Sequence, residues 1–257
     1  MAEARLEQLR RPEMMAGEFE VAVFPIGSTE PHADHLTYGT DTVAVRAFAE
    51  QVVTEANKRG AKCVLLPTLP YGNNENVQQC PWAMSLRPRT MMDFVTDVVA
   101  SVTRNGVKKI VIVNGHGGNT SVLQATFREL APKREVFVAM AEQYTLSEDV
   151  EDEIAETEER GHACEIETSV MLYLAPEHVK MEAAKPTRTR KTVFSNRRHL
   201  YFVNPWHIYT VNTGIGDPTK ASTEKGKRMV TVAVDRLADA LKELGEAPMD
   251  EMFPFRE

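Results

Sequence analysis

Residues that can bind a metal or carry a proton lie close together in the segment 30–41. They follow an apolar run that ends at Gly27, and they are Glu30, His32, Asp34, His35 and Asp41. Glu30 and His32 are two positions apart, so in an extended chain their side chains point to the same side. Carboxylate oxygens together with imidazole nitrogens suit a divalent transition metal. The alternatives are a helix N-cap for Asp41 and a hydrogen-bonded surface position for either histidine.

His116 lies in a second such segment, the glycine-rich run NGHGGN at residues 114–119. Glycines before a helix can let the backbone approach a phosphate closely. The run matches neither the dinucleotide-binding motif nor the P-loop, so we expect His116 to be a ligand. Gly117 and Gly118 would then leave room for a substrate, with a role in packing alone as the alternative.

The run GHACEIETSVML contributes a third group, because Glu167 falls inside an otherwise apolar helix. A carboxylate in such a place is costly unless it is paired or binds a metal. Glu165 is two positions earlier, about 200° around the helix, so we expect it to face elsewhere. His162 is expected in the loop before the helix, free to act as an acid or a base. A hydrogen bond at the helix start is its alternative role.

The elements that must position these residues follow from the apolar pattern. Strand-like runs separated by helical patterns indicate βαβ units, and therefore a three-layer α/β/α fold with a mostly parallel central sheet. Ligands of such sheets bind at the carboxyl ends of the strands, where the segments 30–41 and 114–119 both begin. We expect one domain, residues 1–257. The expected strands are 20–27, 62–68, 108–115 and 135–141, and the expected helices are 42–59, 88–105 and 119–131.

The pattern changes after residue 141. Residues 147–160 include eight acidic residues and predict a solvated amphipathic helix, with Val150 and Ile154 on its apolar face. The helix 165–175 is apolar and should be buried. A basic segment, 185–198, reads as a surface or interface arm. A final helix is expected over 220–244, with Gly245 ending it.

The composition limits the class of protein. A net charge of −7 argues against a nucleic-acid partner. The sequence has neither an apolar stretch of membrane-spanning length nor a signal peptide, so we expect no membrane partner and a cytoplasmic location. The odd number and wide spacing of Cys63, Cys80 and Cys164 favour neither a disulfide framework nor a cysteine zinc site.

Four blocks in order, GSTEPHADHLTYGTDT, NGHGGN, HACEIETS and TGIGDPTKASTEKG, resemble the creatininase (creatinine amidohydrolase) family. The resemblance covers about residues 20–226 and implies a creatininase-like fold with two divalent metal ions per subunit, zinc, manganese or iron. It implies that Glu30 and His116 hold one ion, that His32 and Glu167 hold the other, and that Asp41 bridges them. His162 matches the catalytic histidine of the family. A homohexamer, built as a trimer of dimers, is also implied.

The sequence departs from the pattern of true creatininases. They carry a glutamate where this chain has Gly118 and an acidic residue where it has Gly161, and Asp34 replaces the usual proline of the first block. Creatinine is therefore not the expected substrate. The glycine form resembles formamide-cleaving enzymes of deazaflavin biosynthesis, a peptide-releasing protease of mycofactocin maturation, and ring-opening hydrolases of oxidised inositols.

The expected reaction is hydrolysis by a metal-activated water that attacks a carbonyl of a small polar amide, a class that includes cyclic amides. Opening of a cyclic diketone by C–C cleavage is the alternative, because it begins with the same addition. A formamide deformylase, a peptide-releasing protease and a metal-free binding protein are further alternatives. The candidate substrate contacts are Asp34, Gly117, Gly118, Asn119, Trp82 and Trp206.

Overall fold

The computed structural model describes residues 4–131, 135–194 and 200–255. Its central sheet has the strand order β2-β1-β3-β4, and every neighbouring pair is parallel. This confirms the mostly parallel sheet, although the second strand covers only three of the residues expected in it. The strands are β1 Val21–Ile26, β2 Cys63–Leu65, β3 Lys109–Asn114 and β4 Phe137–Glu142.

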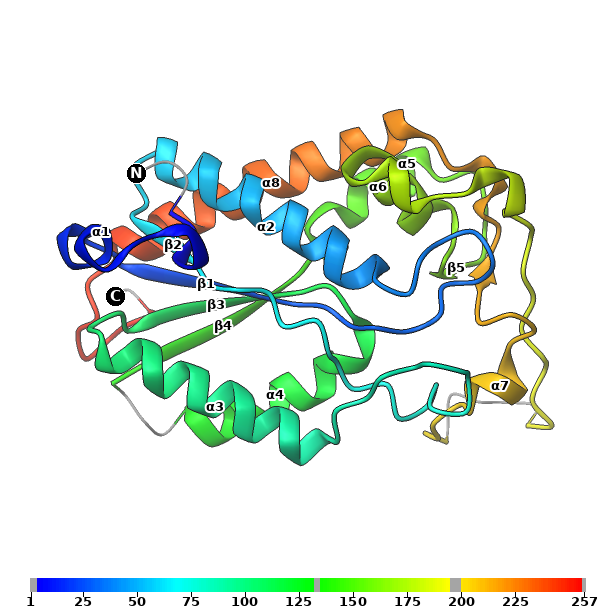
Figure 1. Cartoon of the computed structure of the whole chain (residues 1–257), viewed down its shortest axis with the longest axis horizontal. Helices are drawn as coiled ribbons and strands as arrows, with labels where there is room; N and C mark the ends of the chain where they lie inside the picture. Colours follow the sequence, from blue (N-terminus) through cyan, green and yellow to red (C-terminus); the bar gives the residue numbers. More distant parts are fainter. Residues whose placement is uncertain (1–3, 132–134, 195–199, 256–257) are drawn as a thin grey trace.

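Helices cover both faces of this sheet, as expected for a three-layer fold (Figure 1). One layer holds α2 Thr40–Lys58, α6 Glu165–Leu174 and α8 Thr223–Glu246, and the other holds α3 Pro88–Arg104 and α4 Thr120–Leu130. The remaining elements are α1 Arg11–Ala16, α5 Glu148–Ile154, α7 Trp206–Tyr209 and the antiparallel pair β5 Arg160–His162 and β6 Ile215–Gly216. Short 3-10 turns are η1 Leu6–Gln8, η2 Gly117–Asn119, η3 Thr145–Ser147, η4 Pro176–His178, η5 Met181–Ala183 and η7 Pro218–Lys220.

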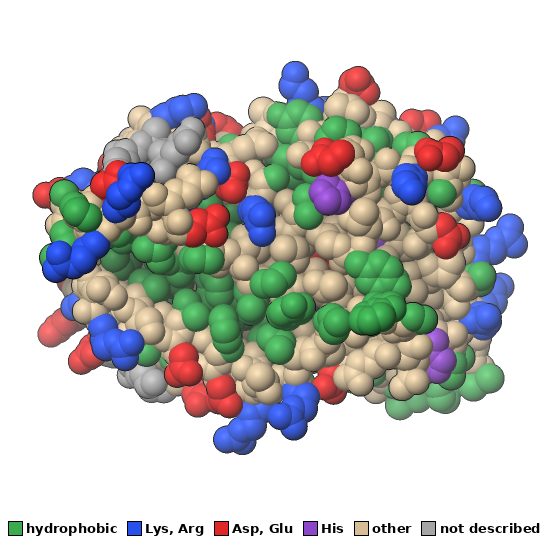
Figure 2. Space-filling view, viewed as in Figure 1, with side chains coloured by type: hydrophobic (Ala, Val, Ile, Leu, Met, Phe, Trp, Pro, Cys, Tyr) green, Lys and Arg blue, Asp and Glu red, His purple; other side chains and the backbone are tan. Residues whose placement is uncertain are grey.

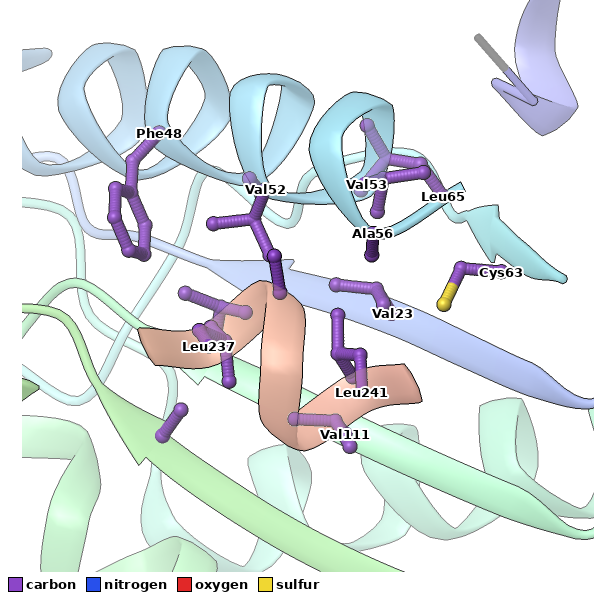
Figure 3. Packing of buried hydrophobic residues seen from close by; sticks show 14 of the residues in the cluster. Val23, Phe48, Val52, Val53, Ala56, Cys63, Leu65, Val111, Leu237 and Leu241 are labelled. Carbon is purple, nitrogen blue, oxygen red and sulfur yellow. The ribbon is translucent and has the colours of Figure 1, made fainter. Parts of the chain in front are cut away.

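Alternate residues of β1 enter two separate cores. Val21 and Val23 pack into the core under α2 and α8, whereas Ala22 and Phe24 pack into the core under α3 and α4. Figure 3 shows the first core, where side chains of α2 and α8 meet over the sheet. A strand buried on both faces is apolar throughout, which is why the sequence pattern is continuous rather than alternating.

Several expected boundaries are wrong, and two of the differences have a clear structural cause. The acidic helix α5 stops at Ile154 rather than continuing to residue 160, because the N–H groups of Glu156 and Thr157 donate to the buried Glu165 carboxylate. Helix α8 continues past Gly245 to Glu246. Its end is fixed by the buried Lys109, whose Nζ donates to the carbonyls of Gly245 at 3.0 Å and Ala247 at 2.6 Å, in keeping with a cation at a helix C-terminus.

The surface of one face shows apolar side chains gathered across its middle (Figure 2). An apolar groove is lined by side chains of the β2–α3 connection and α3, including Leu66, Leu69, Phe94 and Val98. Phe94 is 42% exposed. In the described ranges of the chain, every helix is too short or too polar to cross a membrane.

The packing of α6 against α8 depends on Gly226, and this generates a stability prediction. A Cβ added at Gly226 would lie 1.9 Å from the carbonyl oxygen of Ser169 on α6. We expect Gly226→Ala to lower the free energy of unfolding by about 1–3 kcal/mol, since the two helix backbones must separate. Urea unfolding followed by circular dichroism measures this. The control is Lys227→Ala, an exposed neighbour on α8, which should change stability by less than about 0.5 kcal/mol. Equal stability of the two variants would contradict the prediction.

Candidate metal centre

The fold brings the residues predicted to bind metal to one edge of the sheet. Strands β1 and β3 are paired in register with Ile26 opposite Asn114, so the segments that follow them leave at the same edge. The first segment carries Glu30 and His32, and the second carries His116. Asp41 and Glu167 come from the first turns of α2 and α6.

Close backbone packing places the first turn of α2 against both strand ends. A Cβ at Gly27 would lie 2.5 Å from Cα of Thr42, and a Cβ at Gly115 would lie 2.7 Å from Cβ of Val45. Only glycine permits these approaches at the ends of β1 and β3. The helix start, and with it Asp41, is therefore held directly over the edge of the sheet.

Two clusters of possible ligands share Asp41. One contains Glu30, Asp41 and His116, the other His32, Asp41 and Glu167, and within each the ligand atoms lie within 4.8 Å of one another. Asp41 offers one oxygen to each: its Oδ2 is 3.0 Å from His116 Nδ1, and its Oδ1 is 3.0 Å from His32 Nε2. This arrangement would allow one carboxylate to bridge two cations.

Backbone carbonyls fix the orientation of the three histidine rings. His32 Nδ1 is 3.0 Å from the Glu30 carbonyl, and His162 Nε2 is 3.0 Å from the Pro31 carbonyl. His116 Nε2 is 3.3 Å from the Asn73 carbonyl. Because a carbonyl only accepts, each of these nitrogens carries a hydrogen, and the other ring nitrogen faces the carboxylates, where a bound cation would take up its lone pair.

The centre is buried and strongly anionic. Glu30, Asp41 and Glu167 are 1%, 2% and 7% exposed. Among the described residues, the cationic partners within 4.0 Å of these carboxylates are histidines. In the described part of the chain, Glu30 Oε2 has no hydrogen-bond partner, and the polar partners of Glu30 Oε1 and Asp41 Oδ2 are histidine nitrogens. Buried carboxylate oxygens that lack donors fit a site for divalent cations.

The pKa values of His32, His116 and Asp41 reflect the charges of their neighbours. Burial alone lowers the pKa of His32 and of His116, but the neighbouring carboxylates outweigh it and raise both well above the ordinary value. For Asp41, burial raises the pKa, and the contacts with His32 and His116 reverse this and lower it strongly. The protonated imidazoles therefore neutralise the acids when no metal competes.

Two residues next to the histidines adopt a left-handed backbone, which side chains rarely do. Ala33 and Ala163, directly after His32 and His162, have φ of 52° and 51°. The Ala33 N–H donates to Thr213 Oγ1, and the Ala163 N–H donates to the Glu167 carboxylate. Strained backbone held by specific hydrogen bonds is common at functional sites.

The structure places three other features of single residues. One alternative role is excluded, one expected location is wrong and one expected orientation is confirmed. Asp41 is not an N-cap, because α2 begins at Thr40 after Gly39 and both Asp41 oxygens face histidines. His162 is on strand β5 rather than in a loop. Glu165 faces away from Glu167, as expected: it is fully buried and pairs with Lys225 at 2.5 Å.

An open cleft of about 800 Å³ leads to the centre. Its wall includes Gly117, Gly118 and Trp206, and the Trp206 ring meets the His162 ring edge-on at 4.7 Å. Three residues predicted to contact the substrate are not among the described residues that line this cleft. Trp82 is 79% exposed on the surface, Asp34 is exposed and bonded to Asn212, and Asn119 is buried and bonded to Asn73 and Asn114.

The cleft wall also holds residues that the sequence analysis missed. They are Thr120, Glu142, Tyr144, Glu151 and Arg160. Glu142 ends strand β4. Polar residues at the carboxyl ends of parallel strands commonly contact ligands, so its position in the sequence could have predicted it, as for Glu30 and His116. Arg160 is two residues before His162 on the same strand and pairs with Glu151 at 3.1 Å.

The chain is similar to known proteins in sequence and in fold. Residues 7–241 match the family described as "Creatininase: Creatinine amidohydrolase". A "Mycofactocin precursor peptide peptidase" of Mycobacterium ulcerans (strain Agy99) is 28% identical over 83% of this chain and 81% of its own. A "3-dehydro-scyllo-inosose hydrolase" of Thermotoga maritima is 26% identical over 92% of this chain and 83% of its own. The solved structure of a putative creatinine amidohydrolase from Bacteroides fragilis NCTC 9343 aligns with a TM-score of 0.89 at 28% identity, covering 98% of this chain and 100% of that one.

The shared position of Asp41 generates a prediction of metal content. We expect the protein to bind two divalent ions, Asp41→Ala to lose both, and Glu167→Gln to lose one, because Asp41 belongs to both clusters and Glu167 to one. Elemental analysis after dialysis against a fixed free metal concentration measures this. Asp34→Asn, an exposed acid of the same loop outside both clusters, is the control and should keep both ions. An Asp41→Ala variant that still holds two ions would refute the shared site.

Proposed function

The chain belongs to the creatininase family of hydrolases, and from this premise we propose that it hydrolyses a small polar amide with the help of two divalent metal ions. The observation that carries the proposal is the pair of clusters joined by Asp41. Glu30 and His116 would hold one ion and His32 and Glu167 the other. The ligand set of carboxylates and imidazoles suits zinc, manganese or iron.

Two bound cations would supply Lewis acidity toward a carbonyl oxygen and lower the pKa of a water molecule toward neutrality. The residues of the chain would then hold the substrate and move protons. The donor set fits this role, since among the described residues the polar partners of the Glu30 oxygens and of Asp41 Oδ2 are histidine nitrogens, which can themselves bind a cation.

His162 is the proposed proton carrier. Its Nε2 is engaged by the Pro31 carbonyl, so Nδ1 is the nitrogen that faces the centre, 4.0 Å from Glu30 Oε1. A lone pair in this position can take a proton from the attacking water and return it to the leaving nitrogen. Trp206 covers the ring from the cleft side and restricts its orientation.

A second arrangement of ligands competes with this role. Glu30, His32 and His162 also bring one ligand atom each within 4.8 Å of one another. In that case His162 would be a ligand rather than an acid or base. Metal content and activity distinguish the two roles.

C–C cleavage in a cyclic diketone is the second candidate reaction. It is supported by the similarity over 92% of the chain to a protein named for dehydro-inosose hydrolysis. Addition of water to a carbonyl is common to both reactions, and His162 would return its proton to carbon instead of nitrogen. The size of the cleft is compatible with a ring, and also with the peptide substrate named for another relative.

The predicted homo-oligomer and cytoplasmic location are parts of the proposal. Phe94, which is 42% exposed at the apolar groove, is compatible with an oligomer, since exposed apolar side chains are often covered at interfaces between proteins. The net charge of −7 continues to argue against a nucleic-acid partner.

The role of His162 is tested by His162→Ala. We expect this variant to bind two ions and to lose activity by about 10²–10⁴-fold, the usual contribution of a general acid or base. Elemental analysis and steady-state kinetics give the two readouts. Loss of an ion together with activity would make His162 a ligand. The control Trp206→Phe should keep both ions.

The substrate class is tested by a screen of the metal-loaded protein. We expect turnover of a polar cyclic or linear amide, detected as released amine, in preference to inosose-type diketones and to creatinine. Formamides and short peptides complete the panel. Activity confined to diketones would replace the amide proposal by C–C hydrolysis, and dependence on Glu167 shows that either activity comes from this centre.

A further inference from the structure

Residues outside both clusters hold the ring of His116, and we call them its seat: Asn73, Asn114, Gly118 and Asn119. Its Nδ1 is 2.9 Å from Glu30 Oε1 and 3.0 Å from Asp41 Oδ2, on the side of the carboxylates. On the other side its Nε2 meets the Asn73 carbonyl at 3.3 Å. The two nitrogens are therefore used for different purposes, one toward the cluster and one toward the chain.

The main chain of His116 is held by the side chain of Asn114. Asn114 Oδ1 accepts from the N–H of His116 at 3.3 Å, and Asn114 Nδ2 donates to the carbonyl of His116 at 2.9 Å. The same Nδ2 donates to Glu142 at 2.8 Å. The first asparagine of the NGHGGN run thus fixes the backbone from which the imidazole projects.

The carbonyl that meets the ring is itself held in place. The N–H of Asn73 donates to Oδ1 of Asn119 at 2.9 Å, and Asn119 Nδ2 donates to Asn114 Oδ1 at 3.1 Å. The second asparagine of the run therefore connects the segment at Asn73 to the segment at His116. Asn119 is fully buried, so these bonds are shielded from water.

Gly118 leaves the space in which the ring lies. A Cβ added at Gly118 would be 2.4 Å from His116 Nε2 and 2.3 Å from the Asn73 carbonyl oxygen. Any side chain at this position must displace the ring or that carbonyl. At Gly117, by contrast, an added Cβ meets no described atom within 4 Å.

We propose that Gly118 is a positioning residue for His116: it seats the ring against the Asn73 carbonyl, so that His116 acts as a ligand through Nδ1 in its Nε2–H form. The proposal rests on the proposed metal centre. It adds to that proposal which atom of His116 is the ligand, Nδ1, and which residue orients the ring, Gly118.

The seat has a consequence for the position where true creatininases carry a glutamate. In this chain a glutamate at 118 would begin with the same Cβ, inside the contact distance of the His116 ring. It would therefore have to displace the ring or the Asn73 carbonyl before its carboxylate could reach the cluster. A simple count of ligands predicts the opposite result, tighter binding.

Cobalt(II) binding tests the proposal. Equilibrium dialysis and absorption spectra compare wild type with Gly118→Ala, Gly118→Glu and the matched control Gly117→Ala. We expect Gly118→Ala and Gly118→Glu to weaken one of two sites by about 10–100-fold, the usual effect of removing support from a ligand histidine. Gly117→Ala should bind two ions as wild type does. Tighter binding by Gly118→Glu, or wild-type binding by Gly118→Ala, would overturn the proposal.

A double-mutant cycle separates positioning from a general loss of structure. If Gly118 acts through His116, Gly118→Ala should cause no further loss of cobalt affinity in a His116→Ala background. An additional loss of similar size there would show a role independent of His116. Wild-type protein that binds no cobalt at all would instead refute the proposed metal centre.

Nuclear magnetic resonance of the zinc-loaded wild type keeps the proposal testable if the variants fail to fold. Long-range nitrogen–proton couplings in protein labelled with ¹⁵N-histidine identify the protonated ring nitrogen. His116 should carry its hydrogen on Nε2. A ring protonated on Nδ1 would overturn the assignment.

Discussion

One carboxylate, Asp41, determines how the rest of the centre is arranged. It turns Oδ2 toward His116 and Oδ1 toward His32, and it lies with Glu30 and Glu167 in a nearly dry site. Three buried negative charges without cations would cost several kcal/mol each. The site is therefore stable only with counter-charges, either protonated imidazoles or metal ions. The choice between them is the physical basis of the metal binding that we propose.

The scaffold is arranged so that Asp41 cannot move away from its partners. Helix α2 is fixed on the sheet by Phe48 and Val52, which are fully buried under α8 (Figure 3). The backbone after His32 and His162 is strained, at about 1–2 kcal/mol for each left-handed residue. Packing of the core tolerates this cost because a folded domain gains far more from burial than two strained residues lose.

The sequence alone predicted the sheet, the layers and the residues that meet at its edge. Strand-end polar residues and apolar runs are local signals, and Glu167 was conspicuous as an acid among apolar neighbours. The carbonyls of Pro31 and Asn73 were not predictable, since every residue has one and only the fold decides which meets a histidine. Trp82 and Trp206 have similar polar surroundings in sequence, yet only Trp206 lines the described cleft wall.

Under the proposed function, the centre and the cleft wall have separate tasks, which fits the different substrates for which relatives with this fold are named. Activation of a carbonyl depends on the clusters around Asp41 and places few demands on the rest of a substrate. Selection of the substrate depends on the wall of the cleft, where Arg160 is held by Glu151 and Trp206 covers His162. Gly118 belongs to both tasks, because it lines the cleft and seats His116. A side chain there would change the metal centre and the room for substrate together, so the two cannot vary independently at this position.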